Sequence, residues 1–196
     1  MPLNPTISQT WSGNRVSLAR QTSQILTELE EQFGPMDRSF LFIGWEFDGE
    51  HPMIFHADSG NKHVLMRLSL KASEYWNTAV HELAHECVHL LHPVVGTANN
   101  FEEGLATWYA DYFYRKVVGL DPGGISEAYA GAHDAFLEFL EHAEDGSFVI
   151  RELRKKSLAF SDITAFDLLR FVPTLSPITA DFLVRKWDSS RPNKAT

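Results

Sequence analysis

Cysteine is almost absent from the sequence, with one residue in 196. A single cysteine excludes an intramolecular disulfide and any zinc site built from several thiolates, and it is typical of a reducing compartment. Basic residues are also in the minority: 17 Lys and Arg stand against 26 Asp and Glu, which leaves a formal net charge of −9. This balance argues against nucleic-acid or membrane partners, because both kinds of surface are bound through clustered positive charge.

The sequence also lacks a segment that would direct it into a membrane. No run approaches about 18 uninterrupted apolar residues, so no transmembrane helix is predicted. Residues 1–5 have neither a basic stretch nor a following apolar run, so no secretory signal is predicted and the cytoplasm is the expected location. The length and the 44% hydrophobic content predict one domain over residues 1–187, followed by a flexible polar tail at 188–196.

Apolar spacing predicts an α+β fold. Residues 14–33 repeat apolar side chains at helical spacing and are followed by Gly34-Pro35, which predicts a first helix. Residues 39–70 hold three short apolar runs with turn residues between them, which predict a three-stranded antiparallel meander. These runs are Ser39–Phe47, Pro52–Ala57 and His63–Leu70. The remainder is expected to be mostly helical, with the active-site helices in 73–118 and further helices in 125–187.

The strongest chemical signal is the stretch His81-Glu82-Leu83-Ala84-His85, which has the H-E-x-x-H pattern. Two histidines one helical turn apart can bind one zinc ion, and the glutamate beside the first can act as a base on a metal-activated water. The rest of this helix agrees with a metal site. At about 100° per residue, the apolar residues gather on one side, and the side bearing His81 carries no Lys or Arg. That side holds His81, Glu82, His85, Glu86, His89 and His92.

The next predicted helix opens with Glu103-Gly104-Leu105-Ala106. An H-E-x-x-H helix followed by Glu-Gly at the head of the next helix resembles the gluzincin branch of zinc metallopeptidases, which have a zincin-like fold. The resemblance implies that His81, His85 and Glu103 hold one zinc ion per chain and that Glu82 is the catalytic general base. It implies a peptide or protein substrate, which would pair in extended form with the edge strand before the active helix, here His63–Leu70.

Some assignments within this site stay open. Glu102 competes with Glu103 for the role of third ligand, and Glu103 is preferred because it precedes the glycine. His89 and His92 are expected to line the cleft or support the ligands rather than bind the metal. Tyr129 and His133, four residues apart on a predicted helix, are candidates for stabilising an oxyanion, although a partly buried aromatic and a surface histidine are the favoured interpretations. The basic cluster that contains Arg154-Lys155-Lys156 is expected to be a solvated helix face.

Two other functions are compatible with the same residues. The motif also resembles that of the ImmA/IrrE type of intracellular regulatory metallopeptidase, which implies narrow specificity for one partner protein. The other alternative is a catalytically silent zincin-like domain that binds a partner, or a helical protein in which the motif is a coincidence. Metal content and cleavage of a peptide library distinguish these alternatives.

Overall fold

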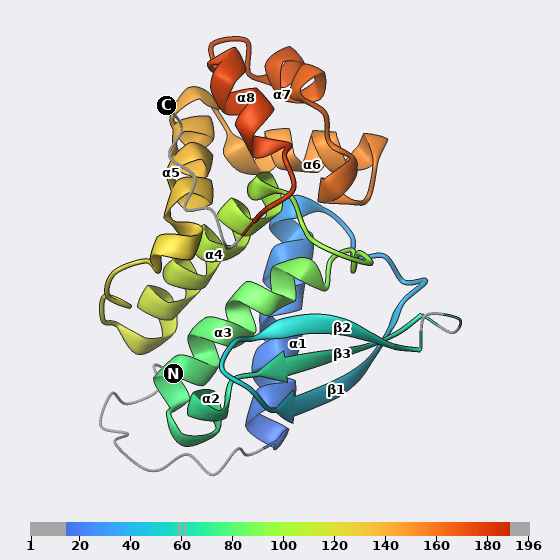
Figure 1. The fold of residues 1–196 in the computed structure, drawn as a ribbon, viewed down its shortest axis with the longest axis vertical. Helices are drawn as coiled ribbons and strands as arrows, with labels where there is room; N and C mark the ends of the chain where they lie inside the picture. The colour runs from blue at the N-terminus through green and yellow to red at the C-terminus, as the bar shows by residue number, and fades with distance from the viewer. Residues whose placement is uncertain (1–14, 59, 61, 189–196) are drawn as a thin grey trace.

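The computed structural model describes residues 15–58, 60 and 62–188, so the tail predicted at 188–196 lies, apart from Asp188, outside the described residues. The chain has one helix, a three-stranded sheet and a mostly helical remainder, which confirms the predicted α+β class (Figure 1). None of the described helices combines the length and the apolar character needed to cross a bilayer. The elements are α1 (Arg15–Phe33), β1 (Leu41–Phe47), β2 (Met53–Asp58), β3 (His63–Leu68), α2 (Leu70–Glu74), α3 (Trp76–His89), α4 (Asn100–Val118), α5 (Glu127–His142), α6 (Gly146–Lys156), η1 (Phe160–Asp162), α7 (Ala165–Phe171) and α8 (Pro177–Leu183).

The sheet is mixed, with the strand order β1-β3-β2. β2 and β3 form an antiparallel pair, but β1 pairs with β3 in parallel, so the prediction of an entirely antiparallel meander is wrong for β1. β1 and β2 therefore run in opposite directions with β3 inserted between them. β3 suits the central position because its alternate residues Val64, Met66 and Leu68 are fully buried, whereas the outer strands expose Leu41 and Met53.

Helix α3 lies at the centre of the molecule. It packs against β2 and β3, against α1, and most extensively against α4, which in turn packs against α5 (Figure 1). Its apolar side joins the core, with Val80, Leu83 and Cys87 fully buried. Its polar side is also withdrawn from solvent, since His85 and Glu86 are buried. Because α4 packs against this side, buried polar residues of α3 such as His85 find partners across the α3–α4 interface.

Arg154 of α6 is buried, and its expected place on a solvated helix face is wrong. Its guanidinium donates hydrogen bonds to the carbonyl oxygens of Phe33, Gly34 and Pro35, at 2.8–3.0 Å, and reaches the carbonyl of Leu91 at 3.4 Å. These carbonyls follow the ends of α1 and α3, where helical hydrogen bonds run out. Arg154 therefore joins two helix ends that are far apart in the sequence.

Gly104 is the point of closest approach between α4 and α5. A Cβ atom at this position would lie 2.6 Å from the Cβ of Phe136, and closer still to the carbonyl oxygen of Ala132. The absence of a side chain lets α5 cross α4 one residue after Glu103. The same crossing carries Tyr129, at the start of α5, to the ring of His85, with 5.4 Å between the ring centroids.

We expect Gly104→Ala to destabilise the protein, because the new methyl group must push the backbone of α5 away from α4. Overpacking of this kind costs about 1–3 kcal/mol, and each kcal/mol lowers the Tm of a chain of this size by about 2–4 °C. Thermal unfolding followed by circular dichroism measures the effect. Gly124→Ala is the matched control, because a Cβ there meets nothing within 4 Å. Equal Tm values for the two variants would contradict this account of the α4–α5 contact.

Candidate metal centre

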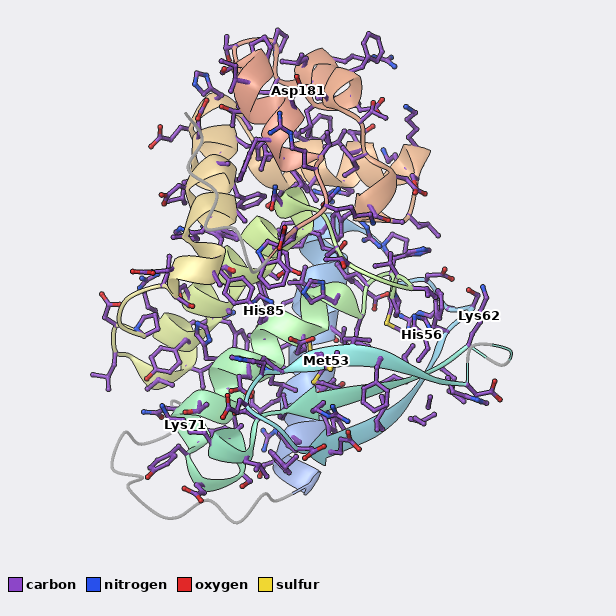
Figure 2. The ribbon with its side chains drawn as sticks, viewed as in Figure 1. Met53, His56, Lys62, Lys71, His85 and Asp181 are labelled. Carbon is purple, nitrogen blue, oxygen red and sulfur yellow. The ribbon has the colours of Figure 1, made fainter. Side chains whose placement is uncertain are left out.

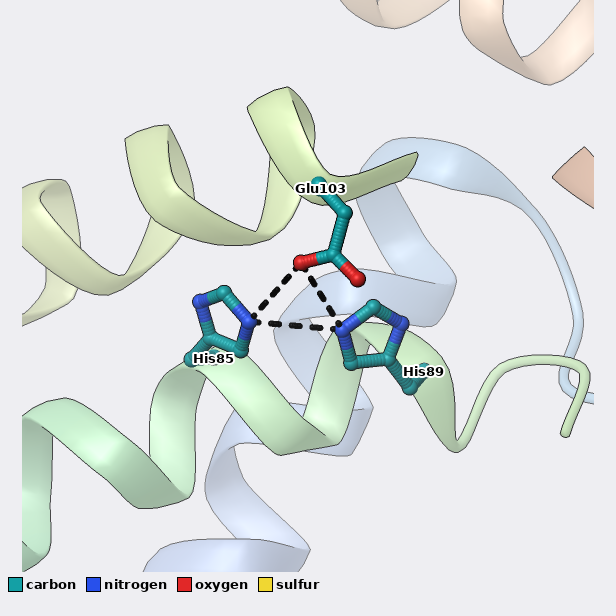
Figure 3. A group of neighbouring side chains, drawn as sticks. All are labelled: His85, His89 and Glu103. Atoms are coloured by element: carbon teal, nitrogen blue, oxygen red, sulfur yellow. Dashed lines mark hydrogen bonds and ion pairs between the residues drawn. The ribbon is translucent and has the colours of Figure 1, made fainter. Parts of the chain in front are cut away.

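Three side chains from two helices converge at the α3–α4 interface (Figure 3). His85 and His89 come from the C-terminal half of α3, and Glu103 comes from the first turn of α4. The Nε2 atoms of the two histidines are 3.3 Å apart, and Glu103 Oε2 lies 3.4 Å from His85 Nε2 and 3.8 Å from His89 Nε2. These three residues can hold a metal ion.

The spacing of the three atoms suits a tetrahedral metal. Zinc bonds of about 2.0–2.2 Å at tetrahedral angles place neighbouring ligand atoms roughly 3.3–3.6 Å apart. The hydrogen bonding of the group is incomplete, since Glu103 Oε2 is buried and has no hydrogen-bond partner. An unsatisfied buried carboxylate oxygen is costly. A cation between the three side chains would satisfy it.

Glu102 supports the group from outside. Its Oε1 lies 2.8 Å from His89 Nδ1, so the Nε2 of the same ring faces His85 and Glu103. A carboxylate that holds the far nitrogen of a ligand histidine fixes the orientation of the ring and strengthens metal binding. The two neighbouring glutamates thus have different positions: Glu103 belongs to the metal group, and Glu102 contacts the back of one imidazole.

The start of α4 is fixed by the C-terminal part of the chain. Asn99 caps the helix by accepting a hydrogen bond from the backbone N–H of Glu102, and its own side chain donates to the carbonyl of Phe160. Asn100 donates to the carbonyl of Phe182. Segments between residues 160 and 182 therefore set the position of the first turn of α4, from which both glutamates project.

Burial and mutual contact shift the pKa values of the group. Burial lowers the pKa of His85, which favours the neutral imidazole that a metal needs. Burial opposes the charged forms of Glu103 and His89, but their attraction to each other outweighs it, so the pKa of Glu103 is lowered and that of His89 is raised to about 10. For Glu86, burial is dominant and raises the pKa to about 8.

His81, predicted as a zinc ligand, points to a different partner. Its Nε2 lies 3.0 Å from Asp111 Oδ1 on α4, two turns after Glu103. The structure does not bring His81 into the group of three ligand atoms. Glu82, predicted as the general base, accepts hydrogen bonds from the backbone N–H and the hydroxyl of Ser69, at 2.8 and 2.6 Å.

Sequence reasoning missed His89 as a member of the group, although the sequence contains a signal for it. The stretch His85-Glu86-Cys87-Val88-His89 is a second H-E-x-x-H pattern, which overlaps the first and shares His85 with it. Its two histidines are the pair that the structure joins to Glu103.

The remaining candidates lie in three different settings. His92 follows the end of α3, and its Nδ1 lies 3.1 Å from Asp37 Oδ2, away from the metal group. The expectation that His133 lies at the surface is wrong, because it is buried in α5, outside the cavity lining. Tyr129 lines the cavity, where its ring stacks on Trp187 at 4.9 Å between centroids.

The metal group lies in a cavity of about 1030 Å³. Strand β2 forms one wall through Met53 and Ile54. Of the side chains labelled in Figure 2, Met53 and His85 line the cavity. The expectation that His63–Leu70 is the edge strand next to the site is wrong, because β3 is paired on both sides. β2 is the edge strand that borders the cavity.

Comparison with protein-family models, with curated proteins and with solved structures found no match to this chain.

We expect Glu102→Gln to weaken metal binding, because a neutral amide holds the imidazole of His89 less firmly than a carboxylate does. Loss of such a supporting carboxylate typically costs 10–100-fold in metal affinity. Competition with a chromophoric chelator measures the zinc Kd. Glu144→Gln, which removes the same charge at an exposed position, serves as the control. An unchanged Kd in Glu102→Gln would show that the contact with His89 Nδ1 is unimportant.

Proposed function

We propose that this chain is a zinc-dependent peptidase whose metal is held by His85, His89 and Glu103. The observation that carries the proposal is the convergence of these three ligand atoms within 4.8 Å of one another at an H-E-x-x-H pattern. Two histidines and a glutamate are a ligand set that zinc takes in metallopeptidases, with one coordination position left for water or substrate. Zinc bound there would supply Lewis acidity to a water molecule and to the scissile carbonyl.

Glu86 is the proposed general base. It follows the first ligand histidine directly, as the glutamate of the pattern requires, and it lines the cavity. Its Oε2 is buried without a hydrogen-bond partner, so it is available to accept a proton. Burial raises its pKa to about 8 in the metal-free group, and a zinc ion bound beside it would lower that pKa, so that the carboxylate can accept a proton near neutral pH.

The surroundings of the group favour an extended peptide as the substrate. The outer edge of β2 borders the cavity, and an edge strand can pair with the backbone of a peptide. Tyr129 enters the cavity beside His85 and is the side chain best placed to donate a hydrogen bond to an oxyanion. Backbone pairing along β2 would bring the scissile carbonyl toward Glu86.

The arrangement predicted first from the sequence shares His85 and Glu103 but uses His81 as the second histidine and Glu82 as the base. It stays a prediction. The contacts of His81 with Asp111 and of Glu82 with Ser69 favour the second pattern, because both side chains already have partners away from the metal group.

Metal analysis of single variants separates the two arrangements. We expect about one zinc ion per chain in the wild-type protein and in His81→Ala. A large loss of zinc is expected in His89→Ala, because His89 belongs to the convergent group and His81 does not. Atomic absorption on purified protein gives the ratio. Zinc lost from His81→Ala and retained by His89→Ala would instead support the first pattern.

Removal of the base tests the catalytic proposal. We expect Glu86→Gln to retain its zinc and to lower hydrolysis of a fluorogenic peptide library by about 10²–10⁴-fold, the usual contribution of a general base. Glu141→Gln, an exposed change on α5, is the control. Full activity in Glu86→Gln would contradict the assignment. A zinc-loaded wild-type protein that cleaves no member of the library would count against a general peptidase.

A further inference from the structure

In the proposed arrangement His81 does not bind the metal and Glu82 is not the general base. Both nevertheless line the cavity that holds the metal group. They lie one helical turn before His85 and Glu86 on α3. Asp111 of α4 lines the cavity as well and contacts His81 at 3.0 Å. The cavity therefore continues beyond the metal group into a second polar region, formed by His81, Glu82, Thr107 and Asp111 and called the acidic end here.

Carboxylates are the most numerous charged groups lining the cavity. Five carboxylates line it, and among the described residues no lysine or arginine does. Three of the five, Glu86, Glu102 and Glu103, belong to the metal group or support it, which leaves Glu82 and Asp111 for the acidic end. Arg115, which is not part of the lining, lies 3.6 Å from Asp111 Oδ2. Burial raises the pKa of Glu82, and the hydrogen bonds from Ser69 and the charges of His81 and Lys71 offset only part of that rise.

Thr107 supplies an independent sign that this region takes a ligand. It lies on α4, one turn after Glu103 and one turn before Asp111, and it lines the cavity. Only 5% of the residue is exposed, and its Oγ1 has no hydrogen-bond partner. A threonine hydroxyl in a helix can usually bond to the carbonyl four residues earlier, so an unpaired buried hydroxyl at this place calls for another partner.

We infer that the acidic end binds a positively charged group of the substrate, an ammonium or a guanidinium. Glu82 and Asp111 provide charge-assisted acceptors and Thr107 a neutral one, which suits a group with several N–H donors. One helical turn spans about 5.4 Å and one residue of an extended peptide about 3.3 Å, so the charged group belongs one or two residues from the scissile bond. This inference rests on the proposed function for its choice of a peptide.

Two chemical sources can supply the charge: a lysine or arginine side chain, or the α-amino group of a peptide whose amino terminus enters the cavity. Three peptides separate them. Acetyl-Gly-Lys-Gly-amide carries only a side-chain charge, Gly-norleucine-Gly-amide carries only an α-amino charge, and acetyl-Gly-norleucine-Gly-amide carries none. Isothermal titration calorimetry on the full-length Glu86→Gln protein measures their binding without a working base to consume them.

At least one charged peptide should bind about tenfold more tightly than the uncharged peptide at low ionic strength, and added salt should reduce the difference. Glu82→Gln and Asp111→Asn, each added to the Glu86→Gln protein, should reduce that preference several-fold, whereas Glu141→Gln should leave it unchanged. Two variants are used because Asp111 also holds His81. Circular dichroism verifies that each variant is folded.

Equal binding of the three peptides, binding of none, or a preference that survives in both variants would overturn the inference. The source of the charge follows from which charged peptide is preferred. Failure of the proposed function has a different signature, since it shows as absent zinc or absent hydrolysis in the wild-type protein, and the calorimetric preference can be read in either case.

Discussion

The packing of α3 against α4 withdraws ionisable side chains from water, and the rest of the structure has to accommodate that constraint. His85, Glu86, Glu102 and Glu103 are all buried at or beside this interface. Buried charges are tolerated only when they are paired or bind a metal. The contacts of His89 with Glu102 and Glu103 satisfy part of the requirement, but Glu86 Oε2 has no hydrogen-bond partner and leaves it incomplete. A divalent cation is the species that would balance this interface.

The position of α4 against α3 therefore decides which polar groups meet at the interface. Segments distant in sequence fix that position. Asn99 and Asn100 attach its first turn to the C-terminal part of the chain through the carbonyls of Phe160 and Phe182. Gly104 lets α5 cross at close range. A shift of α4 along α3 by one turn would exchange the histidines that face Glu103. The C-terminal helices thus contribute to the site by holding the register of the α3–α4 pair.

This dependence explains how much the sequence could predict. Helix and strand periodicity is local, so the α+β class and the helix that ends before Gly34 were accessible. The parallel pairing of β1 was not, because strand order is a non-local property that turn residues do not encode. The H-E-x-x-H signal located His85 and its helix. It could not choose between His81 and His89, which share a face and lie equally far from His85.

Arg154 was misread because three consecutive basic residues give no sign that one of them reaches buried carbonyls.

The sequence of α3 contains the explanation for that ambiguity. His-Glu occurs at 81–82 and again at 85–86, and a third histidine follows at 89, so an identical set of groups recurs after one turn. α4 presents Glu103 opposite the later pair and, two turns further on, Asp111 opposite His81. The two helices thus bring carboxylates against histidines at two places along one cavity, around His81 and around His85 and His89. Only the later one gathers three ligand atoms, because Glu103 meets two imidazole nitrogens there, whereas Asp111 meets one. Identical residue types on one helix face thus acquire different chemistry from what the opposite helix presents to them.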